Sequence, residues 1–184
     1  MSFMGEKTSG FRLALVLGGA RSGKSRYGLR LAAAFPPPRL FVATGEPGDA
    51  EMAARIEEHR RERGPGWDTA DAPLALAEAL TASQGRYGVI LVDCLTLWLS
   101  NLMLTGSPTA ADLQAAGEGL ALVLQESATP TVLISNEVGL GIVPENPLAR
   151  EFRDHLGWLH QRLAQAADLV VLMVAGLPLV VKGV

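Results

Sequence analysis

Eight consecutive residues near the start of the chain have the types and spacing needed to bind phosphate. They follow the apolar run Leu13–Leu17 and match the pattern G-x-x-x-x-G-K-[ST]. The eight are Gly18, Gly19, Ala20, Arg21, Ser22, Gly23, Lys24 and Ser25. Glycines let the backbone curl so that successive N–H groups point at phosphate oxygens, and the positive end of the following helix adds to the attraction. Lys24 would reach the outer phosphates as a catalytic cation, and the Ser25 hydroxyl would ligate Mg²⁺. The pattern predicts a site for a purine nucleoside triphosphate, ATP or GTP, with Mg²⁺.

Polar residues that end other apolar runs could complete this site. Asp93 follows Val89–Val92 and is the expected metal-side carboxylate, although a turn or cap residue at the end of a strand is the alternative. Thr44 and Gly45 follow another run and are assigned to the nucleotide site, with an ordinary turn nearly as well supported. Glu137 could bind magnesium or substrate, or cap a turn.

A charged segment, residues 51–63, is helical by composition. Glu51, Arg55, His59 and Arg63 line one side of it, a pattern that spacing alone assigns to a solvated face with ion pairs four residues apart. A neutral imidazole flanked by arginines is also a capable nucleophile toward phosphorus, because guanidinium groups neutralise the phosphate charge. The segment therefore permits covalent nucleotidyl transfer through His59 without proving it.

Three stretches together resemble the bifunctional adenosylcobinamide kinase / adenosylcobinamide-phosphate guanylyltransferase family of cobalamin biosynthesis. They are the glycine-rich loop 18–25, the segment that runs from Glu51 to His59, and the segment that runs from Asn136 to Asn146. The resemblance implies phosphorylation of adenosylcobinamide, followed by transfer of GMP from GTP to the resulting adenosylcobinamide phosphate. It also suggests a homo-oligomer, with a trimer and a site shared between subunits.

The same resemblance implies roles for individual residues. His59 aligns with the histidine that becomes guanylylated, and Asp71 and Asp93 align with acidic positions of the nucleotide site. The residues that match a guanine-nucleotide contact segment are Arg60, Arg61, Glu62 and Arg63. The sequence departs from the family pattern at Glu58, where some relatives have a second histidine, and at His160, where asparagine is expected. We expect His155 and His160 to be solvated helix residues.

The elements that must position these residues alternate along the chain. Apolar runs typical of buried strands occur at Leu13–Leu17, Leu40–Ala43, Val89–Val92, Thr131–Ile134, Leu169–Val174 and Leu179–Val181. Helical segments are expected at Ser25–Phe35, Ala50–Arg63, Pro73–Thr81, Ala110–Ser127 and Pro147–Ala167. This alternation predicts an α/β fold with a mostly parallel sheet, flanked by helices, that binds ligands at the carboxyl ends of its strands. Residues 11–184 are expected to form one phosphate-loop domain after a flexible tail, residues 1–10.

Composition narrows the class of protein further. Of 184 residues, 48% are hydrophobic and 19% charged, which excludes a largely disordered chain. The net charge of −3 argues against nucleic acid as the main partner. Cys94 is the single cysteine and fits a reducing, cytoplasmic location as a buried apolar side chain. The most apolar stretch, Leu169–Val181, is too short and too broken to span a membrane. The alternative functions are a small-molecule kinase and a nucleotide-dependent switch module, neither of which needs a covalent intermediate.

Overall fold

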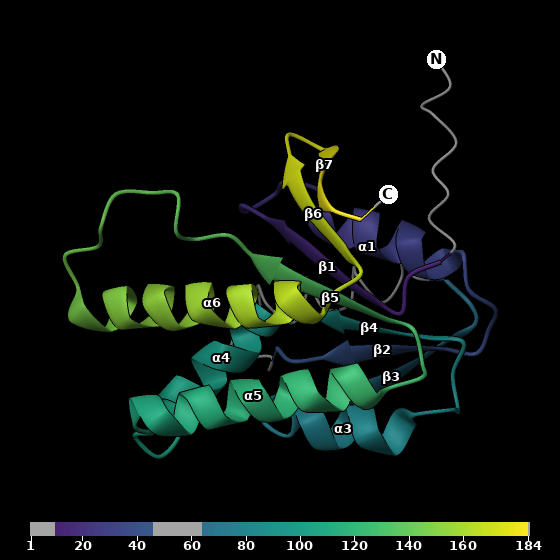
Figure 1. The fold of residues 1–184 in the computed structure, drawn as a ribbon, viewed down its shortest axis with the longest axis horizontal. Coiled ribbons are helices and arrows are strands. Elements are labelled where there is room, and N and C mark those ends of the chain that lie inside the picture. Colours follow the sequence, from purple (N-terminus) through teal and green to yellow (C-terminus); the bar gives the residue numbers. More distant parts are fainter. Residues whose placement is uncertain (1–9, 46–63, 184) are drawn as a thin grey trace.

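The computed structural model describes residues 10–45 and 64–183, and its centre is a seven-stranded sheet (Figure 1). The spatial order of the strands is β3-β2-β4-β5-β1-β6-β7. The strands are β1 (Leu13–Gly18), β2 (Arg39–Ala43), β3 (Trp67–Asp71), β4 (Val89–Asp93), β5 (Thr131–Asn136), β6 (Leu169–Val174) and β7 (Leu177–Lys182). All neighbouring strands are parallel except the β6–β7 pair, which is antiparallel. The carboxyl ends of six strands therefore meet at one edge of the sheet.

Helices cover both faces of the sheet (Figure 1). The helices are α1 (Lys24–Ala33), α3 (Leu76–Ser83), α4 (Leu95–Leu104), α5 (Ala110–Glu126) and α6 (Pro147–Ala166). Helix α1 packs on one face, and α3, α4, α5 and α6 contribute to the core on the other face. Strand β1 shows why its run is continuously apolar: Leu13 and Leu15 face one core, whereas Ala14 and Val16 face the other. This layering confirms the predicted α/β class and its mostly parallel sheet.

Two described elements were not predicted from apolar runs or helical spacing. Strand β3 has the polar sequence WDTAD, and its side chains are half-buried or exposed because it lies at the edge of the sheet. Helix α4 is almost uniformly apolar, with Leu95, Trp98 and Leu99 buried, so it lacks the amphipathic pattern that identifies a surface helix. Strand β7 was expected as an apolar run, but it returns as the second arm of a hairpin rather than through a crossover.

Several bounds differ from the predicted ones by a few residues. Helix α3 begins three residues later than expected, at Leu76, and β5 extends two residues beyond Ile134. The helix predicted at Ala50–Arg63 and the tail predicted at 1–10 lie outside the described residues, apart from Gly10 in the tail. Within the described part of the chain, no helix is long and apolar enough to cross a bilayer.

Candidate functional site

The glycine-rich loop connects β1 to α1 in a conformation that its sequence dictates. Gly23 has a φ of 92°, which favours glycine, and it is the N-cap of α1. Arg21 has a φ of 55°, an uncommon value for a residue with a side chain. A Cβ on Gly18 would lie 2.5 Å from Ser22 Oγ and 2.9 Å from the Met173 carbonyl oxygen. Only glycine therefore fits at Gly18, where the chain leaves the sheet to form the loop.

The turn between β6 and β7 supports this loop from the side. The Gly176 N–H donates a 3.0 Å hydrogen bond to the Ser22 carbonyl oxygen. A Cβ on Gly23 would lie 3.4 Å from the Gly176 Cα, so the two backbones approach closely. The hairpin thus fixes the loop conformation without using the N–H groups that would point at a ligand.

Lys24 and Ser22 have the geometry expected of phosphate-binding groups. The Lys24 ammonium donates a 3.2 Å hydrogen bond to the Gly19 carbonyl oxygen, so the side chain folds back over the loop. Ser22 is 8% exposed, and its Oγ is a buried polar atom with no hydrogen-bond partner among the described residues. A buried hydroxyl without a partner is costly, and a phosphate oxygen would satisfy it. The observation fits a bound phosphate group.

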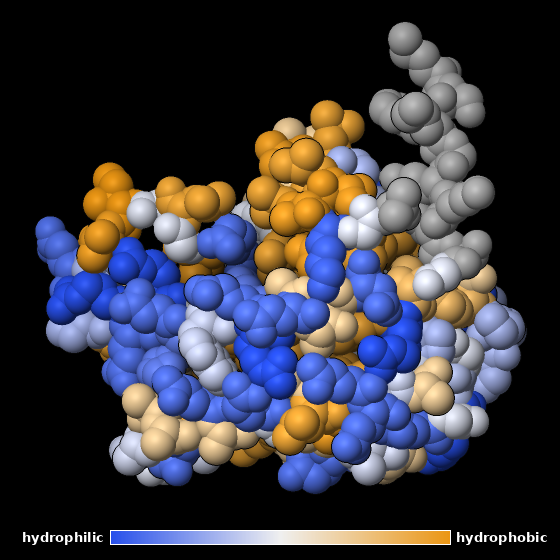
Figure 2. Space-filling model, in the orientation of Figure 1, coloured by the Kyte–Doolittle hydropathy of each residue, from blue (hydrophilic) through white to orange (hydrophobic). Residues whose placement is uncertain are grey.

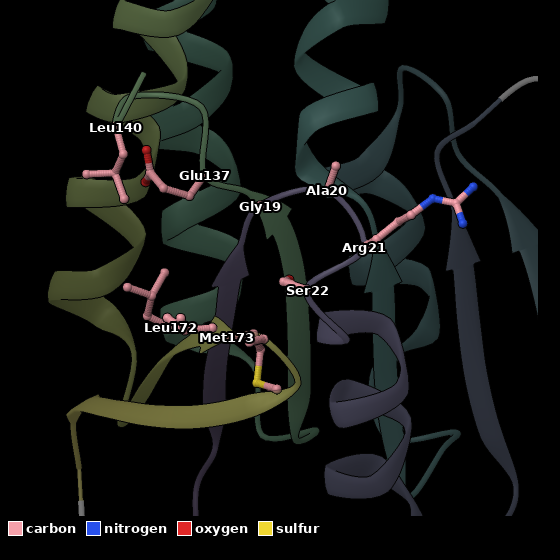
Figure 3. Close-up of a pocket in the computed structure, with 10 residues that line it drawn as sticks. Gly19, Ala20, Arg21, Ser22, Glu137, Leu140, Leu172 and Met173 are labelled. Carbon is pink, nitrogen blue, oxygen red and sulfur yellow. The ribbon is translucent and has the colours of Figure 1, made fainter. Parts of the chain in front are cut away.

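A hollow of about 390 Å³ lies beside the loop. One wall is the loop itself from Gly19 to Ser22, and Glu137 and Leu140 form another (Figure 3). Leu172 and Met173 of β6 lie below them, and the Arg21 side chain extends away from the hollow (Figure 3). The hollow therefore offers apolar surface and one carboxylate next to the phosphate loop.

The two predicted aspartates lie at the carboxyl edge of the sheet. Asp71 ends β3 and Asp93 ends β4, and both are paired in register with Ala43 of β2, which lies between them. Burial and the charge of Asp93 raise the pKa of Cys94, the residue after β4, and the charge of Lys24 acts in the opposite direction. Lys24 is therefore close to the end of β4. Asp93 and Ser25 are half-buried, and both carry the hard oxygen ligands that Mg²⁺ prefers.

Thr44 has a structural role that its position alone did not indicate. It is fully buried, its hydroxyl donates to the Cys94 carbonyl oxygen at 2.7 Å, and it accepts from the Cys94 N–H at 2.8 Å. The Asn101 side chain donates to the Thr44 carbonyl oxygen at 2.8 Å. The Thr44 hydroxyl therefore joins β2 to the start of α4, and its assignment to the nucleotide, like that of the half-buried Gly45, stays a prediction.

Five predicted site residues fall outside the described part of the chain. They are His59, Arg60, Arg61, Glu62 and Arg63. Their assignment as the guanylylated histidine and the guanine-nucleotide contacts stays a prediction.

The expectation that His160 is solvated was wrong. The residue is 7% exposed, and its ring lies between the sheet and α6, with Nε2 2.7 Å from Ser135 Oγ. Its Nδ1 lies 3.8 Å from Glu137 Oε2. Burial lowers the pKa of His160, and the charge of Glu137 opposes that shift. The missed signal was helical spacing: His160 lies four residues after Leu156 and three before Leu163, both fully buried.

His155 differs from His160, although the two were predicted alike. Its side chain is 14% exposed, and its Nε2 lies 3.8 Å from Glu151 Oε1, one helical turn earlier. It is therefore also less solvated than expected.

The chain is similar in sequence to proteins of one enzyme family. The family model described as "Cobinamide kinase / cobinamide phosphate guanyltransferase" matches residues 14–181. The bifunctional adenosylcobalamin biosynthesis protein CobP of Pseudomonas aeruginosa is 47% identical over 169 residues, which cover 92% of this chain and 96% of that protein. The bifunctional adenosylcobalamin biosynthesis protein CobU of Salmonella typhimurium is 41% identical, over 91% of this chain and 98% of that protein.

Solved structures with low sequence identity share the fold. The flagellar accessory protein FlaH of Methanocaldococcus jannaschii matches 94% of this chain and 78% of its own, with a TM-score of 0.53 and 12% identity. An ATPase from the type III secretion system of pathogenic bacteria matches 88% of this chain and 50% of its own, with a TM-score of 0.55 and 13% identity. The relatives of high identity and the family model carry the assignment: this chain belongs to the cobinamide kinase / cobinamide phosphate guanyltransferase family of cobalamin biosynthesis.

Proposed function

We propose that this chain phosphorylates adenosylcobinamide with a nucleoside triphosphate and then transfers GMP from GTP to adenosylcobinamide phosphate through His59. The observation that carries the proposal is the phosphate loop, with Lys24 folded over it and the buried Ser22 hydroxyl left for a ligand, in a chain that matches the family model from residue 14 to 181. The expected product is adenosyl-GDP-cobinamide. One domain, residues 11–184, would carry both reactions.

In the first reaction the loop would hold the triphosphate. Backbone N–H groups of the loop and the start of α1 would bind phosphate oxygens, and Lys24 would neutralise charge on the transferred group. Ser25 and Asp93 would hold Mg²⁺, whose chemistry is to neutralise the phosphate oxygens as the phosphoryl group moves. The acceptor hydroxyl attacks the γ-phosphorus, its proton leaves, and the nucleoside diphosphate departs with the electrons of the broken P–O bond.

In the second reaction His59 would act as a nucleophile. Its neutral imidazole attacks the α-phosphorus of GTP, a P–N bond forms, and pyrophosphate leaves with the electrons of the broken P–O bond. A phosphate oxygen of adenosylcobinamide phosphate then attacks the same phosphorus, and the P–N bond breaks. Arg60 to Arg63 and Asp71 would contact the guanine nucleotide.

The exposed apolar surface supports a homo-oligomer, and we propose a trimer in the cytoplasm. Apolar residues gather over the β6–β7 hairpin and over the segment that follows β5 (Figure 2). The exposed members are Val138, Leu140, Ile142, Val143, Val174, Leu177, Leu179, Val180 and Val181. Patches of this kind on soluble proteins mark interaction sites. Sedimentation equilibrium showing only monomers across micromolar concentrations would remove this part of the proposal.

The proposed function is tested by labelling the protein with GTP that carries ³²P in its α-phosphate. We expect acid-labile, base-stable label on the denatured wild type, none on His59→Ala, and undiminished label on His155→Gln as the matched histidine control. His59→Ala should still transfer the γ-phosphate of ATP to adenosylcobinamide, whereas Lys24→Ala should lose both activities. Label on His59→Ala, or none on the wild type, would contradict the histidine route. A wild type that transfers only γ-phosphate would be a small-molecule kinase.

A further inference from the structure

Glu137 lies beside the phosphate loop, at the carboxyl edge of the sheet. It follows β5, the strand next to β1, and its N–H donates a 3.0 Å hydrogen bond to the carbonyl oxygen of Gly18, the first residue of the phosphate loop. Its carboxylate lines the hollow together with Gly19 to Ser22 (Figure 3). Asp93 lies on the far side of β5, at the end of β4. The two carboxylates therefore approach the loop from different strands and can serve different purposes.

The Glu137 carboxylate is held by a hydrogen bond on one oxygen and lies beside a buried histidine. Oε1 accepts a 2.5 Å hydrogen bond from the Gly139 N–H, and Oε2 lies 3.8 Å from His160 Nδ1, in contact but beyond hydrogen-bond distance. The side chain is 22% exposed, so it keeps access to the hollow while most of it is covered. A carboxylate in such a setting is oriented rather than free to rotate, which is what a group that must accept a proton at a defined position needs.

His160 ends a line of hydrogen-bonding groups that crosses three elements. The Asn136 N–H donates to Thr96 Oγ1 at 2.7 Å, and Thr96 Oγ1 lies 3.2 Å from Ser135 Oγ. Ser135 Oγ in turn lies 2.7 Å from His160 Nε2. One direction satisfies Thr96, Ser135 and His160 Nε2: Thr96 donates to Ser135, Ser135 donates to Nε2, and the proton of the neutral ring is then on Nδ1, on the side of Glu137. Burial lowers the pKa of His160, which agrees with a neutral ring.

Apolar side chains form the remaining walls of the hollow. Leu140, Leu172 and Met173 give it apolar surface beside the Glu137 carboxylate. In the proposed kinase reaction the acceptor is the aminopropanol hydroxyl of adenosylcobinamide, whose carbon also carries a methyl group. A hollow with apolar walls and one carboxylate next to the phosphate loop suits such an acceptor.

We infer that Glu137 orients the acceptor hydroxyl and takes its proton during phosphoryl transfer, and that His160 is a positioning residue that holds Glu137. The inference rests on the proposed function and deepens its first reaction. The O–H bond of the acceptor breaks and its proton goes to the Glu137 carboxylate. The acceptor oxygen bonds to the γ-phosphorus, and the nucleoside diphosphate leaves with the electrons of the broken P–O bond. The histidine-dependent transfer of GMP does not use Glu137.

The first test substitutes Glu137 by glutamine, which keeps an oxygen for the Gly139 N–H but cannot take a proton. With ATP and adenosylcobinamide we expect kcat to fall at least about 100-fold, the usual effect of losing a general base, while the KM for ATP stays within twofold. Labelling of the same variant by α-³²P GTP should proceed at the wild-type rate. Glu151→Gln, which removes one exposed carboxylate from α6, is the matched control and should leave both activities unchanged.

The second test asks whether His160 acts through Glu137. His160→Ala should lower the kinase kcat without changing the KM for ATP, and His160→Asn, which keeps a donor and an acceptor toward Ser135, should recover part of the loss. The double variant Glu137→Gln/His160→Ala should be no slower than Glu137→Gln alone, because residues that act as a unit are not additive. Circular dichroism and thermal unfolding establish that each variant is folded. A merely structural His160 would instead multiply the two losses.

Three results would overturn the inference. Glu137→Gln could keep full kinase activity, it could lose GTP labelling to the same extent as kinase activity, or the losses at Glu137 and His160 could multiply. A wild type with neither activity would overturn the proposed function as well, so the two failures are distinguishable.

Discussion

Cys94 shows how the surroundings of one side chain decide its reactivity. The residue is 6% exposed at the start of α4, and burial, with the charge of Asp93, raises the pKa of its thiol to about 11. The thiolate is the reactive form of cysteine, so at pH 8 only about a thousandth of the molecules would carry it. The expectation that Cys94 is a buried side chain is confirmed.

The consequence is a slow reaction with thiol reagents. We expect the native protein at pH 8 to react with 5,5′-dithiobis(2-nitrobenzoic acid) at least about 100-fold more slowly than the same protein unfolded in urea. The unfolded protein should release one equivalent of the coloured thiolate product rapidly. Absorbance at 412 nm follows both reactions. A native rate close to the unfolded one would mean that the thiol is open to solvent.

At the scale of residues, the sequence was most informative where a function depends on a contiguous segment. The phosphate loop is continuous in sequence, and Gly18, Gly23 and Lys24 have the geometry that its pattern implies. The line from Thr96 to Ser135 and His160 joins α4, β5 and α6, so its members are distant in sequence. Only packing brings them together, so the partners of His160 could not be predicted, although its spacing from Leu156 and Leu163 indicated that it is buried.

Among the elements, the loop that enters β4 depends on close backbone contact. A Cβ on Gly88 would lie 2.0 Å from the Pro36 carbonyl oxygen and 3.0 Å from the Pro36 carbonyl carbon. The Gly88 N–H also donates a 2.8 Å hydrogen bond to the Pro38 carbonyl oxygen, which holds the two segments together. Main-chain atoms cannot rotate aside as a side chain can, so any substitution must move the backbone.

We therefore expect Gly88→Ala to lower the free energy of unfolding by about 2–3 kcal/mol, as overpacking does elsewhere. Gly119 is the control, because it lies inside α5 with open space around its Cα, and alanine there should stabilise the protein by up to about 1 kcal/mol. Urea unfolding followed by circular dichroism measures both. Equal effects of the two substitutions would show that the Pro36 contact does not limit the fold.

The elements themselves were predictable where each has its own pattern of burial. Strands β1 and β5 are apolar on both faces because helices cover both, and α6 alternates buried and exposed positions. Strand β3 was not predicted because an edge strand needs no apolar run. Helix α4 was not predicted because leucine and methionine also occupy half-buried and exposed positions, so the helix has no clear polar face. A local pattern of apolar and polar residues predicts an element only where that pattern follows its burial.

At the scale of the whole molecule, the two edges of the sheet have separate functions. The carboxyl edge carries the phosphate loop, Glu137 and Asp93, whereas the opposite edge holds β1 and β6 together. There Asp168, just before β6, accepts hydrogen bonds on Oδ2 from the Arg12 N–H at 2.8 Å and the Leu13 N–H at 3.0 Å. The Asp168 N–H donates to the Leu13 carbonyl oxygen at 2.9 Å. A charge placed here can stabilise the fold without touching the site.

The Asp168 carboxylate should therefore make the stability of the whole molecule depend on acid pH. Burial acts to raise its pKa, but the hydrogen bonds from Leu13 and Arg12, with the charges of Arg12 and Lys182, lower it overall. Because the folded pKa is below the unfolded one, the stabilisation is present above about pH 4 and is lost as the pH falls through the folded pKa. Asp168→Asn should lower the free energy of unfolding by roughly 1 kcal/mol at pH 7, because solvent weakens the interactions of this exposed carboxylate, and by much less at pH 2.5.

Urea unfolding between pH 7 and pH 2.5 measures the difference, with the exposed Asp154→Asn as the control. A difference between wild type and Asp168→Asn that stays constant over this range would mean that the negative charge contributes nothing, and that only the shape of the side chain holds β1 to β6.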